Sequence, residues 1–83
     1  MSEIAKALDA MLQDSGELSG AIAMRPDYLC IGARGCAVPK DASHFAEAEK
    51  LFDADGCVSI DFKDYLVTLQ KGQGVIIGVY RPK

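Results

Sequence analysis

The hydrophobic residues near the start of the chain recur at the spacing of a helix. Counted from Ile4, the apolar positions fall at i, i+4, i+7 and i+8, with Ala5 beside the first, so that one helix face carries Ile4, Ala5, Leu8, Met11 and Leu12. Ser2 can cap the first turn, and Gly16 can end the helix. The pattern predicts a helix over residues 3–14 with a single buried stripe.

Two strand-like runs follow the first helix, "GAIAM" at residues 20–24 and "YLCIGAR" at residues 28–34. The segment "RPD" separates them. Proline presets φ for a turn, and aspartate bonds the backbone of the turn that it begins. We therefore expect a β-hairpin.

A second helix is expected after Pro39, where Asp41 or Ser43 can act as a cap. We expect it to run over residues 41–52 and to end near "DADG". Its expected apolar face consists of Ala42, Phe45, Ala46, Ala48 and Phe52.

The last third of the chain contains three strand-like runs separated by plausible hairpin connections. These are "CVSIDF" at 57–62, "YLVTLQ" at 65–70 and "VIIGVY" at 75–80. The predicted order is α-β-β-α-β-β-β. The fold class is therefore α+β, with a five-stranded antiparallel meander interrupted once by a helix and no third helix at the C-terminus.

The strands differ in how their apolar residues are distributed. "CVSIDF" alternates apolar and polar positions, as a strand buried on one face does, whereas "VIIGVY" and "YLCIGA" are apolar on both faces. Two short helices can cover only a patch of each sheet face. We therefore expect the first helix or another protein to cover part of the final strand, and the candidate partner surface is Ile76, Val79, Tyr80 and Arg34.

Composition limits the possible functions. The 83 residues predict one domain over residues 1–83, and a hydrophobic content of 49% is high for so small a domain. The formal net charge of −3 argues against nucleic-acid binding. We find no apolar run long enough to span a membrane and no signal peptide, so we expect an intracellular chain without direct membrane insertion.

No set of residues for catalysis, metal binding or cofactor binding is recognisable. His44 is the only histidine, which is too little for a nucleophile and base pair. The spacing of Cys30, Cys36 and Cys57 matches no zinc site, and buried thiols or one reactive thiol both remain open. "LFDADGCVSID" fails the EF-hand register, and the glycines near the C-terminus do not form a phosphate loop. We expect no enzyme, no cofactor and no metal.

Two segments, "SGAIAMRPDYLCIGARG" and "CVSIDFKDYLVTLQKGQGVIIGVYRPK", resemble the roadblock/dynein light chain family, and more narrowly the short roadblock subunits of Ragulator complexes. The resemblance implies a dimer that pairs second helices and joins third strands edge to edge. Carried onto this sequence, it assigns the helix contact to Ala42, Phe45, Ala46 and Glu49, and the strand contact to Cys57, Val58, Ser59, Ile60, Asp61 and Phe62.

The same resemblance implies a non-catalytic scaffold subunit. Its expected partners are another roadblock-domain subunit, a larger scaffold subunit and Rag-type GTPases in amino-acid and target-of-rapamycin signalling. The expected location is cytoplasmic, at the cytosolic face of the lysosome or late endosome through these partners. The alternatives are a stand-alone roadblock regulator of a small GTPase and a small profilin-like or PAS-like ligand-binding sensory module. Whether the dimer is a homodimer or a heterodimer stays open.

Overall fold

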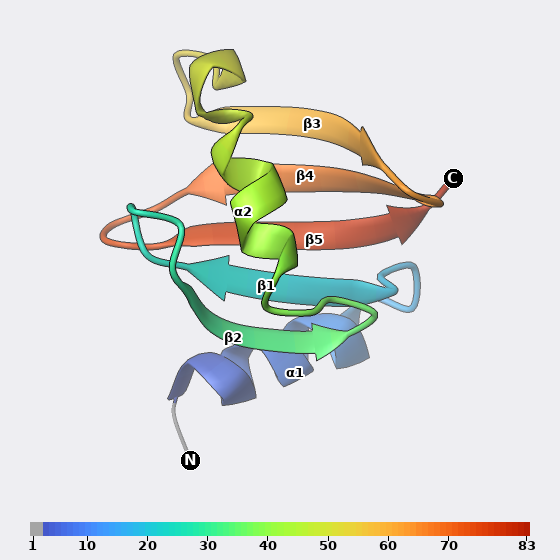
Figure 1. Cartoon of the computed structure of the whole chain (residues 1–83). Coiled ribbons are helices and arrows are strands. Elements are labelled where there is room, and N and C mark those ends of the chain that lie inside the picture. The colour runs from blue at the N-terminus through green and yellow to red at the C-terminus, as the bar shows by residue number, and fades with distance from the viewer. Residues whose placement is uncertain (1–2) are drawn as a thin grey trace.

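The computed structural model describes residues 3–83, and its elements follow the predicted order (Figure 1). Helix α1 has the expected bounds, and the expected cap at Ser2 lies outside the described residues. The elements are α1 Glu3–Asp14, β1 Gly20–Met24, β2 Cys30–Gly35, α2 Asp41–Ala46, a 3₁₀ turn η1 Glu49–Leu51, β3 Cys57–Phe62, β4 Tyr65–Lys71 and β5 Ile76–Pro82.

The five strands form one antiparallel sheet in the order β2-β1-β5-β4-β3. The expected meander is therefore modified, because β5 returns to pair with β1. Both β1 and β5 are apolar on their two faces, and central positions bury both faces of a strand. Strands β2 and β3 are left as the two edges of the sheet.

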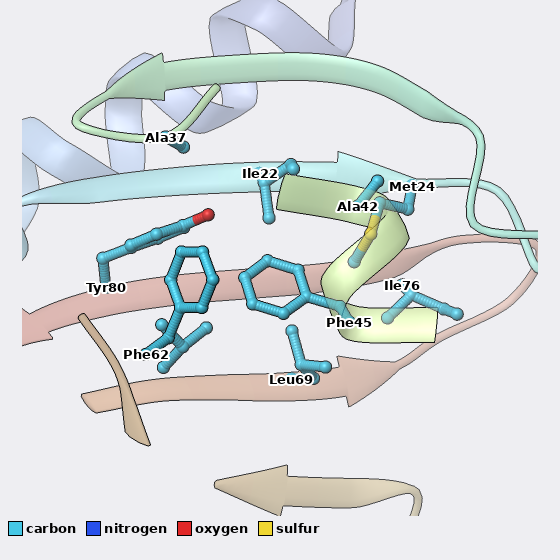
Figure 2. Close-up of a cluster of buried hydrophobic side chains, with 10 residues drawn as sticks. Ile22, Met24, Ala37, Ala42, Phe45, Phe62, Leu69, Ile76 and Tyr80 are labelled. Carbon is cyan, nitrogen blue, oxygen red and sulfur yellow. The ribbon is translucent and has the colours of Figure 1, made fainter. Parts of the chain in front are cut away.

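The two helices lie on opposite faces of this sheet (Figure 1). On one face, Leu8 of α1 packs against Ala21 and Ala23 of β1. On the other face, α2 inserts Phe45 into the larger cluster of buried side chains (Figure 2). The layers are thus helix, sheet and helix, as the predicted α+β class requires.

Gly78 lies where strands β4, β5 and β1 pack most closely. A Cβ atom at this position would lie 2.7 Å from Cδ2 of Leu69 and 2.9 Å from Cγ2 of Ile22. The close approach that a glycine inside a strand suggests is present here. Because Gly78 has no side chain, the side chains of Leu69 and Ile22 can both lie over the middle of the sheet.

The second helix is shorter than the expected range of residues 41–52. Its α-helical part ends at Ala46, and the N–H of Ala48 bonds to the carbonyl of Phe45, three residues back instead of four. This tighter turn leads into η1, whose Glu49 is held by Lys71 of β4. A contact with the sheet therefore redirects a segment whose sequence permits a longer helix.

Strand bounds differ from the predictions by one or two residues. Tyr28, expected in the second strand, has φ of 67° and belongs to the turn before β2. Strand β5 is shifted towards the C-terminus and reaches Pro82 because Tyr65 of β4 pairs opposite that residue. Such differences are typical of strand ends, which the pairing partner defines.

Candidate functional site

Strand β3 is an edge of the sheet, and its side chains alternate as predicted. Val58, Ile60 and Phe62 lie on the side covered by α2, opposite Leu69, Val67 and Tyr65 of β4. Cys57, Ser59 and Asp61 share the other side of the sheet. Because β3 pairs only with β4 in the described sheet, its second row of backbone groups faces away from the sheet.

Hydrogen bonds at the start of β3 show which of its backbone groups face outward. The carbonyl of Gly56 accepts from the N–H of Lys71 on β4 at 2.8 Å. The next residue, Cys57, faces the opposite way: its N–H donates to Oδ1 of Asp53, and its carbonyl accepts from the N–H of Asp53, both at 3.0 Å. Backbone groups alternate along a strand, so Ser59 and Asp61 also face away from β4.

Asp53 therefore blocks the first part of this edge and leaves a short segment for a partner. Sequence analysis described Asp53 only as part of a helix exit and turn. The signal that could have identified it is the spacing of Asp53 before Asp55 and Cys57, since aspartate commonly bonds backbone N–H groups that follow it. Its Oδ1 accepts from both of these residues.

The opposite edge of the sheet, β2, is blocked by the side chain of Arg34. The N–H of Cys36 bonds to the carbonyl of Ser19 beside β1, so Ala33, three positions earlier, faces outward. The guanidinium of Arg34 donates to the carbonyl of Ala33 at 3.0 Å and pairs with the Asp9 carboxylate of α1 at 3.2 Å. Arg34, expected on a partner surface, contacts this chain's own α1.

The predicted helix contact is only partly accessible. Ala42 and Phe45 are 4% and 0% exposed and point into the chain's own core (Figure 2). Ala46 is half-buried and Glu49 is exposed. A partner that meets α2 in this conformation therefore contacts its outer side and not the row that contains Phe45.

Glu49 holds η1 against the sheet and the β1–β2 turn. Its carboxylate accepts from Nζ of Lys71 at 2.8 Å and from the Tyr28 hydroxyl at 2.5 Å. These two hydrogen bonds lower the pKa of Glu49. Burial, followed by the hydrogen bond and the negative charge of Glu49, raises the pKa of Tyr28 well above its ordinary value. The ammonium of Lys71 also lies 4.5 Å from the ring centroid of Phe52.

Asp41 and Tyr80 connect α2 to the centre of the sheet. The Tyr80 hydroxyl donates to Oδ2 of Asp41 at 2.7 Å, and the N–H of Val38 donates to the same oxygen at 3.3 Å. Burial and the bond to Asp41 raise the pKa of Tyr80. The ring of Tyr80 contacts Phe45 and Phe62 edge to face. Tyr80 and Ile76, expected on a partner surface, are 1% and 2% exposed beneath α2.

The face that carries α1 is covered only in part. Helix α1 packs against β1 and β2. Further across the same face, Val79 of β5 lies opposite Thr68 of β4, and Leu66 is 39% exposed. Val79, another residue of the expected partner surface, is itself half-buried, so part of its side chain is accessible.

The described residues contain no recognisable centre for metal binding. Within residues 3–83, no group of three or more histidine, cysteine and acidic residues is placed to hold a metal ion. The ring of His44 instead packs against Phe62 with centroids 4.9 Å apart. Cys30, Cys36 and Cys57 are free and half-buried. None of the helices in this part of the chain is long and apolar enough to cross a membrane.

Two surface grooves flank α2. One of about 430 Å³ lies at the end of β3 between Lys40, His44 and Phe62, and another of about 560 Å³ runs between Leu29, Pro39 and Ala46. Both are open depressions, whereas the ligand-binding alternative calls for an enclosed pocket with converging polar groups.

The strand order and the two opposed helices define the class of fold to which this chain belongs. Solved structures of the Roadblock/LC7 domain from Streptomyces avermitilis have the same architecture. One aligns with a TM-score of 0.70 and 18% sequence identity over 98% of this chain and 79% of that chain. A second gives a TM-score of 0.69 and 18% identity over 99% of this chain and 82% of that chain. The chain thus has the roadblock fold. No protein-family model and no curated protein matches its sequence.

Proposed function

We propose that this protein is a non-catalytic interaction subunit that pairs, through β3 and the outer side of α2, with a second roadblock-like domain. The observation that carries the proposal is the open segment of β3, where Ser59 and Asp61 direct backbone groups away from the sheet. Unpaired edges bind other strands readily. The roadblock fold of the chain supports this proposal.

We further propose that the pair belongs to a Ragulator-like scaffold that holds Rag-type GTPases at the cytosolic face of the lysosome or late endosome. This rests on the sequence resemblance, which is closest to hepatitis B X-interacting protein. A larger scaffold subunit would cover the accessible side chains of Leu66, Thr68 and Val79 beyond α1. Residues 1–83 would act as one domain in this assembly. A stand-alone regulator of a small GTPase is the alternative.

A proline at Ser59 tests the pairing directly. Proline removes a backbone N–H, and the N–H of Ser59 faces away from β4, so Ser59→Pro removes a bond to the partner while preserving the β3–β4 ladder. Ser59→Ala is the matched control because it keeps the N–H. Light scattering after size exclusion should show paired protein, or a complex with a co-purified partner, for the control and a monomer for the proline variant.

Other results of these binding experiments would contradict the proposed pairing or distinguish between the two proposed roles. If wild-type protein is a strict monomer at high micromolar concentration and pull-down recovers no partner, the proposed pairing is wrong. Recovery of a complete assembly with lipid-anchored subunits and GTPases would favour the Ragulator-like role. Recovery of a single small GTPase would favour the stand-alone regulator.

A further inference from the structure

The chain stays helical beyond the end of α2, but in a tighter form. Glu47 has φ of −69° and ψ of −19°, and Ala48 has φ of −87° and ψ of 3°. The N–H of Ala48 bonds to the carbonyl of Phe45, and the N–H of Leu51 bonds to the carbonyl of Ala48, both at 2.9 Å. Residues 47–51 therefore continue the helix with bonds to the third residue back, which is the 3₁₀ pattern.

The local sequence does not require this tighter form. Residues 47–52, "EAEKLF", contain neither proline nor glycine, and alanine, glutamate, lysine and leucine are good α-helix formers. Bonds to the third residue back have poorer geometry than those of an α-helix, and a 3₁₀ stretch that continues a helix often marks a hinge. The ψ angle of Ala48 lies only about 45° from its α-helical value. A small rotation of the backbone therefore separates the two forms.

Contacts from two other elements hold the tighter form. The carboxylate of Glu49 accepts from Nζ of Lys71 on β4 at 2.8 Å and from the hydroxyl of Tyr28 in the β1–β2 turn at 2.5 Å. The ammonium of Lys71 also lies 4.5 Å from the ring centroid of Phe52, at the other end of η1. Tyr28 has φ of 67°, a left-handed conformation that is unfavourable for a bulky residue. We refer to Glu49, Lys71 and Tyr28 as the clamp.

We propose that residues 47–52 are a conformational switch, which the clamp holds as a 3₁₀ turn and which joins α2 as an α-helix when the clamp opens. In the α-helical form, the carbonyl of Ala48 would exchange the N–H of Leu51 for that of Phe52. A 3₁₀-helix turns about 20° more per residue than an α-helix, so the exposed side chain of Leu51 would rotate by about 100°. Opening the clamp would therefore change the surface that follows the outer side of α2.

The exposure of the clamp makes its opening accessible to a partner. The carboxylate of Glu49 and the ammonium of Lys71 belong to side chains that are 46% and 38% exposed, and ion pairs at exposed positions are weak. A switch needs such a small difference in free energy between its two forms. A basic side chain of a partner at the outer side of α2 can compete with Lys71 for Glu49. This regulatory use rests on the proposed function, whereas the switch itself is a property of the chain alone.

Nuclear magnetic resonance of the isolated chain tests the switch. Glu49→Gln and Lys71→Met each remove one charge of the clamp, and Glu47→Gln is the matched control because Glu47 is an exposed glutamate of the same segment. In both clamp variants, the carbon-13 chemical shifts of residues 47–52 should move towards α-helical values. Hydrogen exchange at the N–H of Phe52 should slow at least about threefold, because this group gains a hydrogen bond. The control should match wild type.

Three results would overturn the inference. Unchanged shifts in both clamp variants would show that the 3₁₀ form does not depend on the clamp. Random-coil shifts over residues 47–52 would show that the clamp only anchors η1. An equal change in Glu47→Gln would show that any loss of charge on the segment has this effect. Tyr28→Phe, which removes only a hydroxyl, gives a second reading if Lys71→Met fails to fold. None of these results concerns pairing, which light scattering tests separately, so the proposed function holds or fails independently.

Discussion

The hydroxyl of Tyr80 donates a hydrogen bond to Oδ2 of Asp41 across 2.7 Å, and it does so in the buried layer between α2 and the sheet. Asp41 is the first residue of α2, and Tyr80 belongs to the central strand β5. A buried carboxylate that loses a partner retains the cost of its removal from water. This single bond therefore connects the position of α2 to the centre of the sheet.

Removing the Tyr80 hydroxyl should destabilise the protein. We expect Tyr80→Phe to lower the free energy of unfolding by about 1–3 kcal/mol, because Asp41 is then left with fewer donors while still buried. Tyr65→Phe is the matched control, since the Tyr65 side chain is only half-buried and its hydroxyl lies beside the thiol of Cys36, a weak hydrogen-bonding group. Urea denaturation monitored by circular dichroism measures the free energy of unfolding of both variants. An equal loss in the two variants would contradict the role given to Asp41.

Gly78 should not tolerate a larger residue. In Gly78→Ala the new Cβ would meet the side chains of Leu69 and Ile22 at 2.7 and 2.9 Å, so these side chains must shift. We expect a loss of about 1–3 kcal/mol, the usual cost of overpacking a core. Gly16→Ala is the control because a Cβ there meets nothing within 4 Å. Thermal unfolding should show a lower melting temperature for Gly78→Ala than for Gly16→Ala. An unchanged melting temperature for Gly78→Ala would disprove the close packing at this position.

Acid should weaken the attachment of η1 to the sheet. The bonds from Lys71 and Tyr28 lower the pKa of Glu49 in the folded state. A group with a lowered folded pKa contributes stability above its unfolded pKa, and this contribution is lost as the pH falls through the folded pKa. Glu49→Gln should therefore be less stable than wild type at neutral pH, and the difference should shrink below about pH 4. Glu47→Gln, on the exposed surface, is the control. A difference that does not depend on pH would argue against the charged bond.

Alkali should destabilise the folded protein by favouring ionisation of its tyrosine hydroxyls. The pKa values of Tyr28, Tyr65 and Tyr80 are all raised in the fold. A raised folded pKa means that the stability present below the unfolded pKa, near 10, decreases as the pH rises towards the folded value. Absorbance at the tyrosinate band should show little ionisation at pH 10.5 in native protein and ionisation of about three-quarters of the tyrosines in urea, where the pKa is near 10. Half-ionised native protein at pH 10 would contradict the raised values.

Local sequence pattern accounts for most of the elements in this fold. The bounds of α1 and of β3 were predicted correctly because a helical stripe and a clean alternation depend on the chain's own spacing. The second helix was predicted too long because its sequence does not show that Glu49 will meet Lys71 of β4. Contacts between distant segments override local preference at such points.

The sequence by itself determined the α+β class, the order of elements and the identity of β3 as an alternating strand, because these follow from side-chain period. Only the tertiary structure decided that β5 lies beside β1, that Phe45 and Tyr80 are core residues, and that Asp53 and Arg34 block parts of the two sheet edges. These facts depend on which backbone groups find partners across the fold. Such partners are set by proximity in space and not by position along the chain.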